Sequence, residues 1–402
     1  MTPHVLLMPL PARGHVTPAL AVAAELVKRG KRVTFATVKD YADEVTETGA
    51  TALVYESELA THEIPAAFTV DYMAREPLRC IEEAIRATRI LEAELAGDFP
   101  DVVVYDVATF PTGRALARKH GRPSIQLFPV FASNEEFSFG AAQAEELAEP
   151  FPVDHPAFAE FFVKVSEFIA EHELGIGAEE LLVGCDESNI VFLPRRFQLE
   201  VDKFDDRHTF VGPCRLPAKD EVTWRREGDG PLALISLGTT FNHNADFFRD
   251  CARAFTGLPW EVVITLGDKV DPAELGELPP NVRAHRFVPH APVLAEADVF
   301  VCHAGVGSMM EALDLGVPLV LVPPEVTEHR LNAKRAVELG LGRMLAPADA
   351  TPDALRDAVL SVAADPAVRT AVTGIRADFA AAGGPVKAAE VIEASLTRAA
   401  AL

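Results

Sequence analysis

The sequence predicts an α/β fold with two domains, each containing a parallel sheet covered by helices on both faces. Three observations lead to this prediction. Short apolar runs alternate with stretches of helical periodicity in both halves, which is typical of βαβ units. At 402 residues, the chain is long enough for two separate cores. Between the halves, residues 207–230 are polar and carry Pro213, Pro217, Gly228 and Gly230, which indicates an interdomain connection.

The strands of both halves are predicted from their apolar runs. In the first half, an apolar strand, a turn rich in proline and glycine and a helix at residues 18–29 begin the βαβ pattern. The strands expected there are residues 5–10, 32–37, 101–105, 124–130 and 189–193. Those expected in the second half are residues 231–237, 261–266, 282–288, 299–303, 318–322 and 342–345, and an alanine-rich helix follows from residue 385.

Composition excludes several classes of protein. The hydrophobic share of 49% and the charged share of 24% are typical of a globular chain. A net charge of −23 argues against nucleic-acid binding and against anionic membranes. No basic segment precedes the first apolar run and no apolar stretch reaches about 18 residues, so a soluble cytoplasmic protein is expected. The five cysteines form no C-x-x-C pair, so neither disulfides nor a zinc site is expected.

Residues 299–311 carry the strongest functional signal. Here an apolar strand is joined to a helix through a turn that contains His303, Gly305, Gly307 and Ser308. Small residues let backbone N–H groups approach an anion, and the first turn of a helix offers unsatisfied donors, so the turn predicts a diphosphate site. Glu311, two helical turns from His303 and near the same face, is expected to accept from ribose hydroxyls. A glycine turn between a strand and a helix is also common in α/β folds, so this segment alone does not distinguish a phosphate site from an ordinary turn.

A second candidate site lies in the first half. His15 follows the first predicted strand and precedes a predicted helix, where open α/β sheets bind their ligands. Asp106 ends another predicted strand. An aspartate bonded to one imidazole nitrogen fixes the tautomer while the other nitrogen takes a proton, so the two residues would form a general-base pair. The alternatives are a surface histidine and an aspartate that caps the following turn.

Together these motifs resemble the GT-B glycosyltransferases of the macrolide and antibiotic natural-product family, over essentially the whole chain. Residues 14–18, Gly-His-x-x-Pro, are similar to the catalytic loop of that family, and Asp106 stands where the family keeps the acid that partners its histidine. The segment of His303, Gly305, Val306, Gly307, Ser308 and Glu311 is similar to its nucleoside-diphosphate site. The resemblance implies two Rossmann-like domains facing across a cleft. They would be an acceptor domain at 1–212, a linker at 213–230, a nucleotide-sugar domain at 231–384, and a terminal helix at 385–402 that packs back on the first domain.

The same resemblance assigns further residues to the donor. The loop after the strand at 231–237 is similar to the family's Ser-Leu-Gly-Ser/Thr loop near the diphosphate, here Ser236, Gly238, Thr239 and Thr240. Phe287 stands where many members have tryptophan and would stack on the base, while the main chain of Val288 would pair with the edge of the base. Glu328 and His329 replace the Asp-Gln pair of glucose-using members. This departure favours a thymidine-diphosphate (TDP) deoxysugar or aminosugar over UDP-glucose.

The resulting hypothesis is an inverting glycosyltransferase in which His15 activates a hydroxyl of a hydrophobic natural-product acceptor. No D-x-D sequence occurs, so neither a metal nor another cofactor is expected beyond the nucleotide-sugar co-substrate. The partners expected are that donor and the acceptor, without nucleic acid or membrane insertion, and a homodimer is left open. Aromatic residues between 131 and 173 are expected to serve both the core and an apolar acceptor pocket.

Several alternatives to this hypothesis are considered. A UDP-glucose-dependent enzyme that inactivates macrolides is the alternative within the family. A nucleotide-sugar 2-epimerase would need paired acids where His15 stands, and a non-catalytic partner of another glycosyltransferase would be expected to lack the pair or the phosphate turn. A Rossmann oxidoreductase is disfavoured because no G-x-G-x-x-G follows the first strand.

Overall fold

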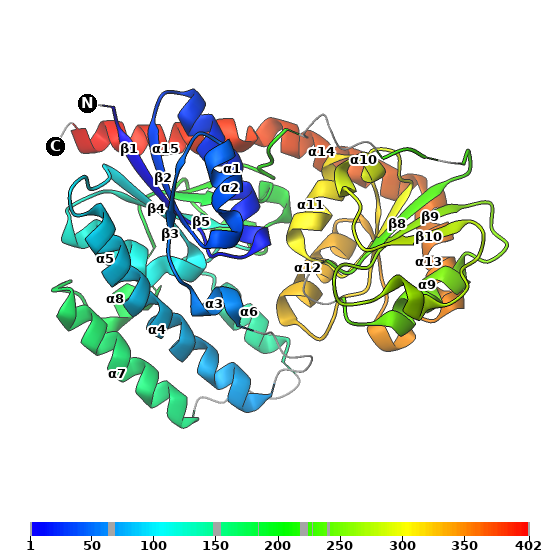
Figure 1. Ribbon diagram of the computed structural model, residues 1–402, viewed down its shortest axis with the longest axis horizontal. Coiled ribbons are helices and arrows are strands. Elements are labelled where there is room, and N and C mark those ends of the chain that lie inside the picture. Colours follow the sequence, from blue (N-terminus) through cyan, green and yellow to red (C-terminus); the bar gives the residue numbers. More distant parts are fainter. Residues whose placement is uncertain are drawn as a thin grey trace. The chain divides into compact units, whose positions relative to one another are not determined.

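The computed structural model describes residues 2–62, 69–147, 154–183, 185–217, 224–226, 228–238 and 242–400. The chain forms two compact units, which are drawn in Figure 1: the first comprises Met1–Leu216 with Ala380–Leu402, and the second comprises Pro217–Phe379. The first boundary lies inside the segment expected to connect the domains. The second lies within helix α14 (Pro366–Ala382), so the chain returns to the first unit before residue 385.

The first unit is built on a seven-stranded sheet with the order β3-β2-β1-β4-β5-β6-β7. All neighbouring strands are parallel. This is the doubly wound order, in which the chain moves outward in one direction from β1 and then in the other from β4. Its strands are β1 (His4–Met8), β2 (Arg32–Thr37), β3 (Thr51–Val54), β4 (Val102–Asp106), β5 (Ser124–Phe128), β6 (Asn189–Val191) and β7 (His208–Phe210).

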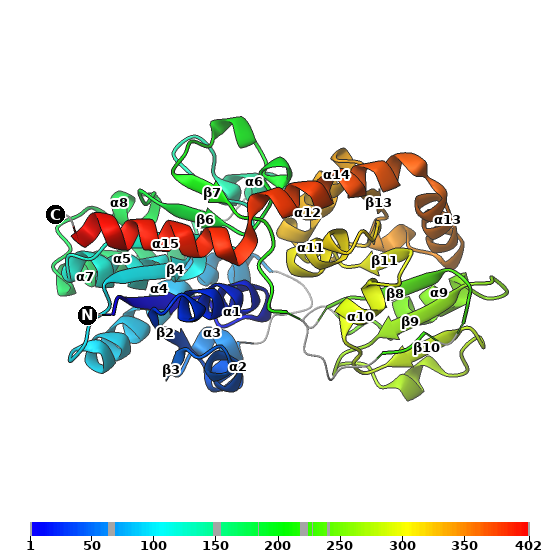
Figure 2. The same cartoon turned by 90° about the horizontal axis from the view of Figure 1, so that it is seen from above.

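Helices cover both faces of this sheet. Because successive side chains of a strand point to opposite faces, Val5 and Leu7 of β1 join one core and Leu6 and Met8 another. The helices of this unit are α1 (Arg13–Lys28), α2 (Ala42–Glu47), α3 (Glu58–Thr61), α4 (Val70–Leu95), α5 (Phe110–Lys119), α6 (Phe139–Glu145), α7 (Pro156–Glu171), α8 (Ala178–Val183) and α15 (Gly384–Ala400). Buried α15 residues, including Ile392, pack in the same core as α1, and the two helices lie side by side in Figures 1 and 2.

The second unit repeats the topology with six parallel strands in the order β10-β9-β8-β11-β12-β13. Its strands are β8 (Leu232–Ser236), β9 (Glu261–Thr265), β10 (Val282–His285), β11 (Val299–Cys302), β12 (Leu319–Leu321) and β13 (Gly342–Met344). The helices α9 (Ala245–Ala254) and α13 (Pro352–Ala364) pack in one core. The other helices are α10 (His290–Leu294), α11 (Val306–Asp314), α12 (Thr327–Glu338) and α14. Figure 2 shows α11 and α12 on the opposite face of the sheet.

The sequence predictions fail at three elements. β3 is not predicted because this edge strand is partly exposed and lacks a buried apolar run. β7 lies in the polar stretch that was assigned to the interdomain connection from residue 207, and its three residues are too few for an alternating pattern. α1 begins at Arg13, not at residue 18, so Pro18 lies inside the helix although its ring nitrogen cannot donate to the carbonyl of Gly14.

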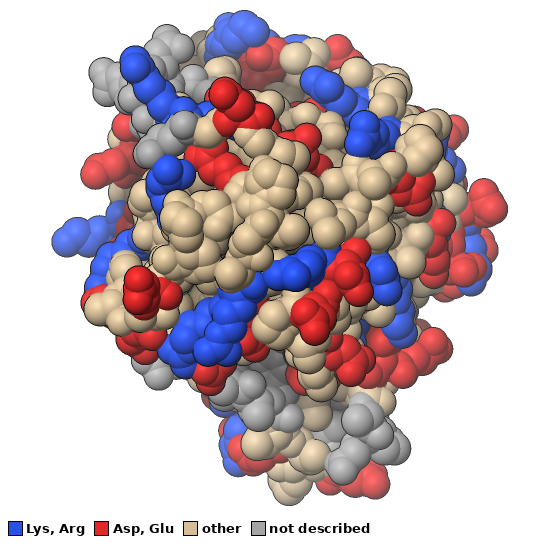
Figure 3. Space-filling model, turned by 90° about the vertical axis from the view of Figure 1, so that its right-hand side faces the viewer, with Lys and Arg blue, Asp and Glu red and all other residues tan. Residues whose placement is uncertain are grey.

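Two features concern the expectation that the protein binds neither nucleic acid nor a membrane: the distribution of charge on one face and the length of the helices. Figure 3 shows the side of the molecule at the right of Figure 1, where basic and acidic side chains are interspersed around an area without charged groups. Among the described residues, no single helix is long and apolar enough to span a membrane. One pair bent by 68°, Pro352–Ala364 with Pro366–Arg398, passes that test on length and composition alone.

Candidate active site

In the first unit, the structure brings His15 and Asp106 together. Nδ1 of His15 lies 2.8 Å from Oδ2 of Asp106. The Asp106 side chain is 1% exposed and the His15 side chain is 21% exposed. The pair lies at the carboxyl ends of β1 and β4, which are hydrogen-bonded neighbours in the sheet, so the loops that follow them meet at the same edge.

Asp106 is fixed by the turn that follows β4. Its Oδ1 accepts a hydrogen bond from the Ala108 N–H at 2.8 Å, and its own N–H donates to Oγ1 of Thr109 at 3.1 Å. Oγ1 of Thr109 in turn donates to the carbonyl of Met8 at the end of β1. Asp106 is therefore both a cap of this turn and the partner of His15, because each carboxylate oxygen serves one role. The two interpretations raised by the sequence are compatible.

His15 was expected in the loop before a helix. In the structure it lies in the first turn of α1. The backbone N–H groups of His15 and Val16 bond to the carbonyl of Ala12, the N-cap of α1, so the helix has already begun at His15. The positive end of the helix dipole therefore lies beside the Asp106 carboxylate, which stabilises a negative charge there. A residue in a helical turn is also held more firmly than one in a loop.

The aromatic residues between 131 and 173 mostly belong to the core. Phe131 stacks against Phe197 with ring centroids 5.7 Å apart, and Phe168 is fully buried in a cluster with α4 and α8. Phe162 is the exception, with 51% of its surface exposed. The expectation of an apolar pocket formed by these residues stays a prediction, and Phe151, which belongs to this stretch, lies outside the described residues.

In the second unit, His303 occupies the point where the strand order reverses, between β8 and β11. A doubly wound sheet binds its ligands in the crevice at that point. The imidazole ring fits there because two neighbours lack a side chain. A Cβ atom on Gly238 would lie 2.5 Å from Cε1 of His303, and one on Gly305 would lie 2.5 Å from Nε2. These glycines therefore make room for the histidine ring, a role different from the close approach of an anion that the sequence suggested.

Burial keeps His303 neutral. Burial, together with the smaller effect of the neighbouring His329, lowers the pKa of His303 to about 3. The rings of His303 and His329 meet edge to face with centroids 5.0 Å apart. Burial likewise lowers the pKa of His329 to about 4 and that of His290 to about 4. A neutral His303 can still donate one hydrogen bond, but it brings no positive charge to an anion.

The first turn of α11 supplies backbone donors next to His303. Gly305 is the N-cap of this helix, so the N–H groups of Val306, Gly307 and Ser308 stand at its positive end. A Cβ on Gly307 would meet nothing within 4 Å, and this residue is exposed, so the backbone is accessible there. The hydroxyl of Ser308 donates to the carbonyl of Gly305 at 3.0 Å.

The relation expected between His303 and Glu311 is wrong in its geometry. The two residues do not lie two helical turns apart, because the helix begins only at Val306 and His303 belongs to the preceding loop. Glu311 instead lies one helical turn after Gly307, so the two share a face of α11. The carboxylate is partly buried there.

The other residues predicted to bind the donor lie in different surroundings. Ser236 ends β8, is buried, and accepts a hydrogen bond from the Gly238 N–H at 3.3 Å. Thr239 and Thr240 lie outside the described residues. Phe287 follows β10 and is 78% exposed, whereas Val288 is buried.

Glu328 and His329 both belong to the first turn of α12, but they lie in different surroundings. Glu328 is partly exposed at the positive end of the helix, where an acid is favourable for the dipole alone. His329 is buried against His303. His329 therefore packs behind the turn that contains His303.

Two asparagines at this site were not found from the sequence. Asn332 of α12 is fully buried, and its Nδ2 donates to the carbonyl of Ala304 at 3.0 Å. Asn242 is also buried, and in the described part of the chain neither polar atom of its side chain has a hydrogen-bond partner. Gly267 leaves room for the Asn242 side chain, since a Cβ on Gly267 would lie 1.9 Å from Nδ2 of Asn242. The only available signal was that an asparagine is a poor residue for the middle of a helix such as α12.

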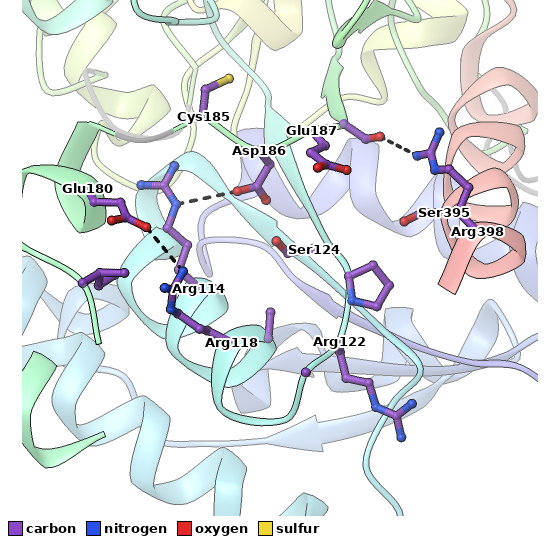
Figure 4. A pocket seen from close by; sticks show the side chains of 15 residues that line it. Arg114, Arg118, Arg122, Ser124, Glu180, Cys185, Asp186, Glu187, Ser395 and Arg398 are labelled. Atoms are coloured by element: carbon purple, nitrogen blue, oxygen red, sulfur yellow. Dashed lines mark hydrogen bonds and ion pairs between the residues drawn. The ribbon is translucent and has the colours of Figure 1, made fainter. Parts of the chain in front are cut away.

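A cavity of about 650 Å³ with several charged residues in its lining lies at the amino-terminal ends of strands of the first sheet (Figure 4). It is lined by Ser124, the first residue of β5, whereas Asp106 is the last residue of β4, so the cavity and the His15–Asp106 pair are at opposite strand ends. Its arginines already have partners in the chain. Arg118 pairs with Glu180 and Arg398 donates to Ser188. We therefore place the candidate active site elsewhere. Among the residues described, no cluster of three or more His, Cys, Asp or Glu could hold a metal ion.

Comparison with known proteins places the chain in a family. Residues 6–117 match the family model of the glycosyltransferase family 28 N-terminal domain, and residues 253–395 match that of the erythromycin biosynthesis protein CIII-like C-terminal domain. The demethyllactenocin mycarosyltransferase of Streptomyces fradiae is 37% identical over 99% of this chain and 87% of its own length. The oleandomycin glycosyltransferase of Streptomyces antibioticus is 35% identical over 98% and 91%, respectively.

The fold agrees with a solved structure. The calicheamicin glycosyltransferase CalG4 superposes with a TM-score of 0.87 at 37% identity, covering 99% of each chain. The prediction of a GT-B fold from the sequence is thus confirmed, as is the predicted class of enzyme. The chain is a glycosyltransferase and belongs to the GT-B family of macrolide and antibiotic natural-product glycosyltransferases.

Proposed function

We propose that the enzyme transfers a sugar, with inversion at the anomeric carbon, from a nucleoside diphosphate to a hydroxyl of a hydrophobic natural-product acceptor. The observation that carries this proposal is the 2.8 Å contact between Nδ1 of His15 and Oδ2 of Asp106. In the tautomer whose Nδ1–H donates to the carboxylate, Nε2 carries the lone pair and can accept a proton. Asp106 then stabilises the imidazolium that forms.

The reaction is a single displacement. The acceptor oxygen forms a bond to the anomeric carbon while its proton passes to Nε2 of His15. The bond from that carbon to the diphosphate oxygen breaks on the opposite face, and its electron pair leaves with the diphosphate. General-base catalysis of this kind contributes typically about 10²- to 10⁴-fold in rate. The rest must come from orientation and from stabilisation of the leaving group.

For the leaving group, we propose that the diphosphate binds at the first turn of α11. The N–H groups of Val306, Gly307 and Ser308 and the positive end of the helix dipole would meet its negative charge. Neutral His303 would add one hydrogen bond and Glu311 would accept from ribose hydroxyls. On the flanks, Phe287 would stack on the base and the main chain of Val288 would bond to its edge. No divalent metal takes part in this proposal, because the helix end performs the same electrostatic role.

For the donor sugar, we propose a TDP-linked deoxysugar or aminosugar. Glu328, partly exposed in the first turn of α12, would accept hydrogen bonds from the sugar. His329 is buried behind His303 and would present an apolar edge in place of the hydrogen-bonding glutamine of glucose-using relatives. The competing assignment, UDP-glucose-dependent inactivation of a macrolide, differs only in this donor choice.

The experiment combines binding and transfer. TDP and UDP are titrated by calorimetry, and a TDP-deoxysugar and UDP-glucose then compete for transfer to a hydroxylated macrolide aglycone. The expected results are tighter TDP binding, a higher kcat/KM for the TDP-deoxysugar, and a product of inverted anomeric configuration by NMR. Clear preference for UDP-glucose would replace the donor assignment with its competitor. A product of retained configuration would overturn the single displacement.

A further inference from the structure

The turn between β11 and α11 has an unusual backbone. Ala304 has a φ of +64°, a left-handed conformation that it shares only with Glu173 and Glu200 among the non-glycine residues that the structure describes. The residue is fully buried. Residues with a side chain rarely adopt this conformation, so neighbouring groups must hold Ala304 in it.

The conformation of Ala304 directs the helix that follows. The next residue, Gly305, is the N-cap of α11, so the peptide between them sets where the first N–H groups of the helix point. Gly305 also lies against the His303 ring, since a Cβ on Gly305 would lie 2.5 Å from Nε2, so a residue with a side chain does not fit at this N-cap. A change in the backbone conformation of Ala304 would therefore misdirect the donors proposed for the diphosphate.

One side chain holds this peptide from another helix. Nδ2 of Asn332, in the middle of α12, donates to the carbonyl of Ala304 at 3.0 Å, and both residues are 0% exposed. Oδ1 of Asn332 is buried without a hydrogen-bond partner in the described part of the chain. A buried unsatisfied oxygen is unfavourable, so an apolar residue would suit the packing of α12 better. The hydrogen bond to the Ala304 carbonyl thus explains the asparagine at this position.

The same face of α12 makes a second contact with the turn. His329 lies three residues before Asn332, so the two side chains share one face of the helix. His329 packs edge to face against His303, while Asn332 bonds to the following residue. α12 therefore supports two consecutive residues of the turn.

We propose that Asn332 is a positioning residue for the nucleoside diphosphate. It holds Ala304 in its left-handed conformation and so aims the first turn of α11 at the phosphates. The proposal rests on the proposed function, since it takes this turn as the diphosphate site. Asn332 itself need not touch the donor.

The main test is Asn332→Leu, which keeps a similar volume but removes the hydrogen-bond donor. Calorimetry with TDP and with UDP should show affinity falling on the order of tenfold, while KM for the acceptor stays unchanged. The second substitution, Ala304→Gly, should recover most of the lost affinity in the Asn332→Leu background, because glycine adopts a positive φ without a steric penalty. If Asn332→Leu does not fold, Asn332→Ala with and without Ala304→Gly gives the same comparison.

A matched control lies before β10, an edge strand of the same sheet. Nδ2 of Asn281, just before β10, also donates to backbone carbonyls, those of Phe255, Leu258 and Trp260. Asn281→Leu should lower the melting temperature and leave TDP affinity unchanged. Equal losses of affinity in the two variants, or no rescue by Ala304→Gly, would overturn the positioning role. A wild-type enzyme that binds neither TDP nor UDP would instead refute the proposed function.

Discussion

Replacing Asp106 with asparagine should nearly abolish transfer without disturbing the fold. The two oxygens of Asp106 have different partners, which determines how an amide would sit. The Ala108 N–H must face an acceptor, so the amide oxygen takes the place of Oδ1. The NH₂ group then takes the place of Oδ2 and faces Nδ1 of His15.

This orientation reverses the hydrogen bond to the histidine. An NH₂ group donates, so Nδ1 must accept this hydrogen bond and the ring proton moves to Nε2. Nε2 then cannot take up the proton of the substrate hydroxyl. The negative charge that stabilises the imidazolium is lost as well. In serine proteases, the same substitution beside the catalytic histidine lowers kcat by about 10⁴-fold. That factor corresponds to about 5.4 kcal/mol of transition-state free energy, and we expect an effect of this order.

The measurement is the initial rate of glycoside formation at saturating donor, followed by chromatography. A thermal melt should show a near-native transition, because the bond to Ala108 is retained. Thr109→Val is the matched control: it removes the hydroxyl that bonds to the Asp106 N–H and the Met8 carbonyl but leaves the carboxylate beside His15. We expect Thr109→Val to change the melting temperature more clearly than it changes the initial rate. A turnover of Asp106→Asn within about tenfold of wild type would leave Asp106 with its capping role alone.

Four further predictions follow from the same geometry. His15→Ala should lower turnover by about 10²- to 10⁴-fold and leave TDP affinity nearly unchanged, and a loss below tenfold would remove His15 from catalysis. His303→Ala or Glu311→Ala should weaken diphosphate binding by roughly 1.5–3 kcal/mol in calorimetry, whereas unchanged titrations would move the phosphate site elsewhere. Urea unfolding of the second unit should become easier as the pH falls from about 6.5 towards 4, because the pKa values of His290, His303 and His329 are lowered to about 4, 3 and 4, so the unfolded chain binds more protons in that range. The slope should approach about 1.4 kcal/mol per pH unit for each histidine, and a flat profile would contradict their burial as neutral rings. Transfer should survive EDTA, and a complete loss that magnesium or manganese restores would refute the metal-free proposal.

The sequence predicts the interior of this fold better than its edges. All six strands of the second unit fall at expected positions. The four inner strands β8, β9, β11 and β12 are buried throughout and appear as apolar runs, as parallel strands covered on both faces do. The edge strands β10 and β13 were also expected, although they are only partly buried. β3 and β7 are missed for the opposite reason. They are short strands away from the centre of their sheet, and their sequences are partly exposed or polar. Helix starts are also misjudged, since Pro18 suggested a first turn that in fact begins at Arg13.

At the candidate site, too, some contacts could be predicted from the sequence and others could not. His15 and Asp106 can be expected together because both follow strands of a parallel sheet, whose carboxyl ends meet at one edge. The contacts made by Gly238, Asn332 and Asn242 depend on which loops pack against each other, and no local pattern records that. Gly238 illustrates the point, because its lack of a side chain is required by a ring 65 residues later in the sequence.

The two units use one topology for opposite electrostatics. In each sheet, the candidate chemistry lies where the strand order reverses, between β1 and β4 or between β8 and β11. In the first unit, that position holds the Asp106 carboxylate beside the positive end of α1. The full negative charge of the carboxylate outweighs the partial positive charge of the helix end, so this position repels a diphosphate but stabilises an imidazolium. In the second unit, it holds neutral His303 beside the positive end of α11, which favours an anion and cannot stabilise a protonated base. Local charge alone therefore favours proton removal from the acceptor in the first unit and diphosphate binding in the second, independently of how the units are arranged.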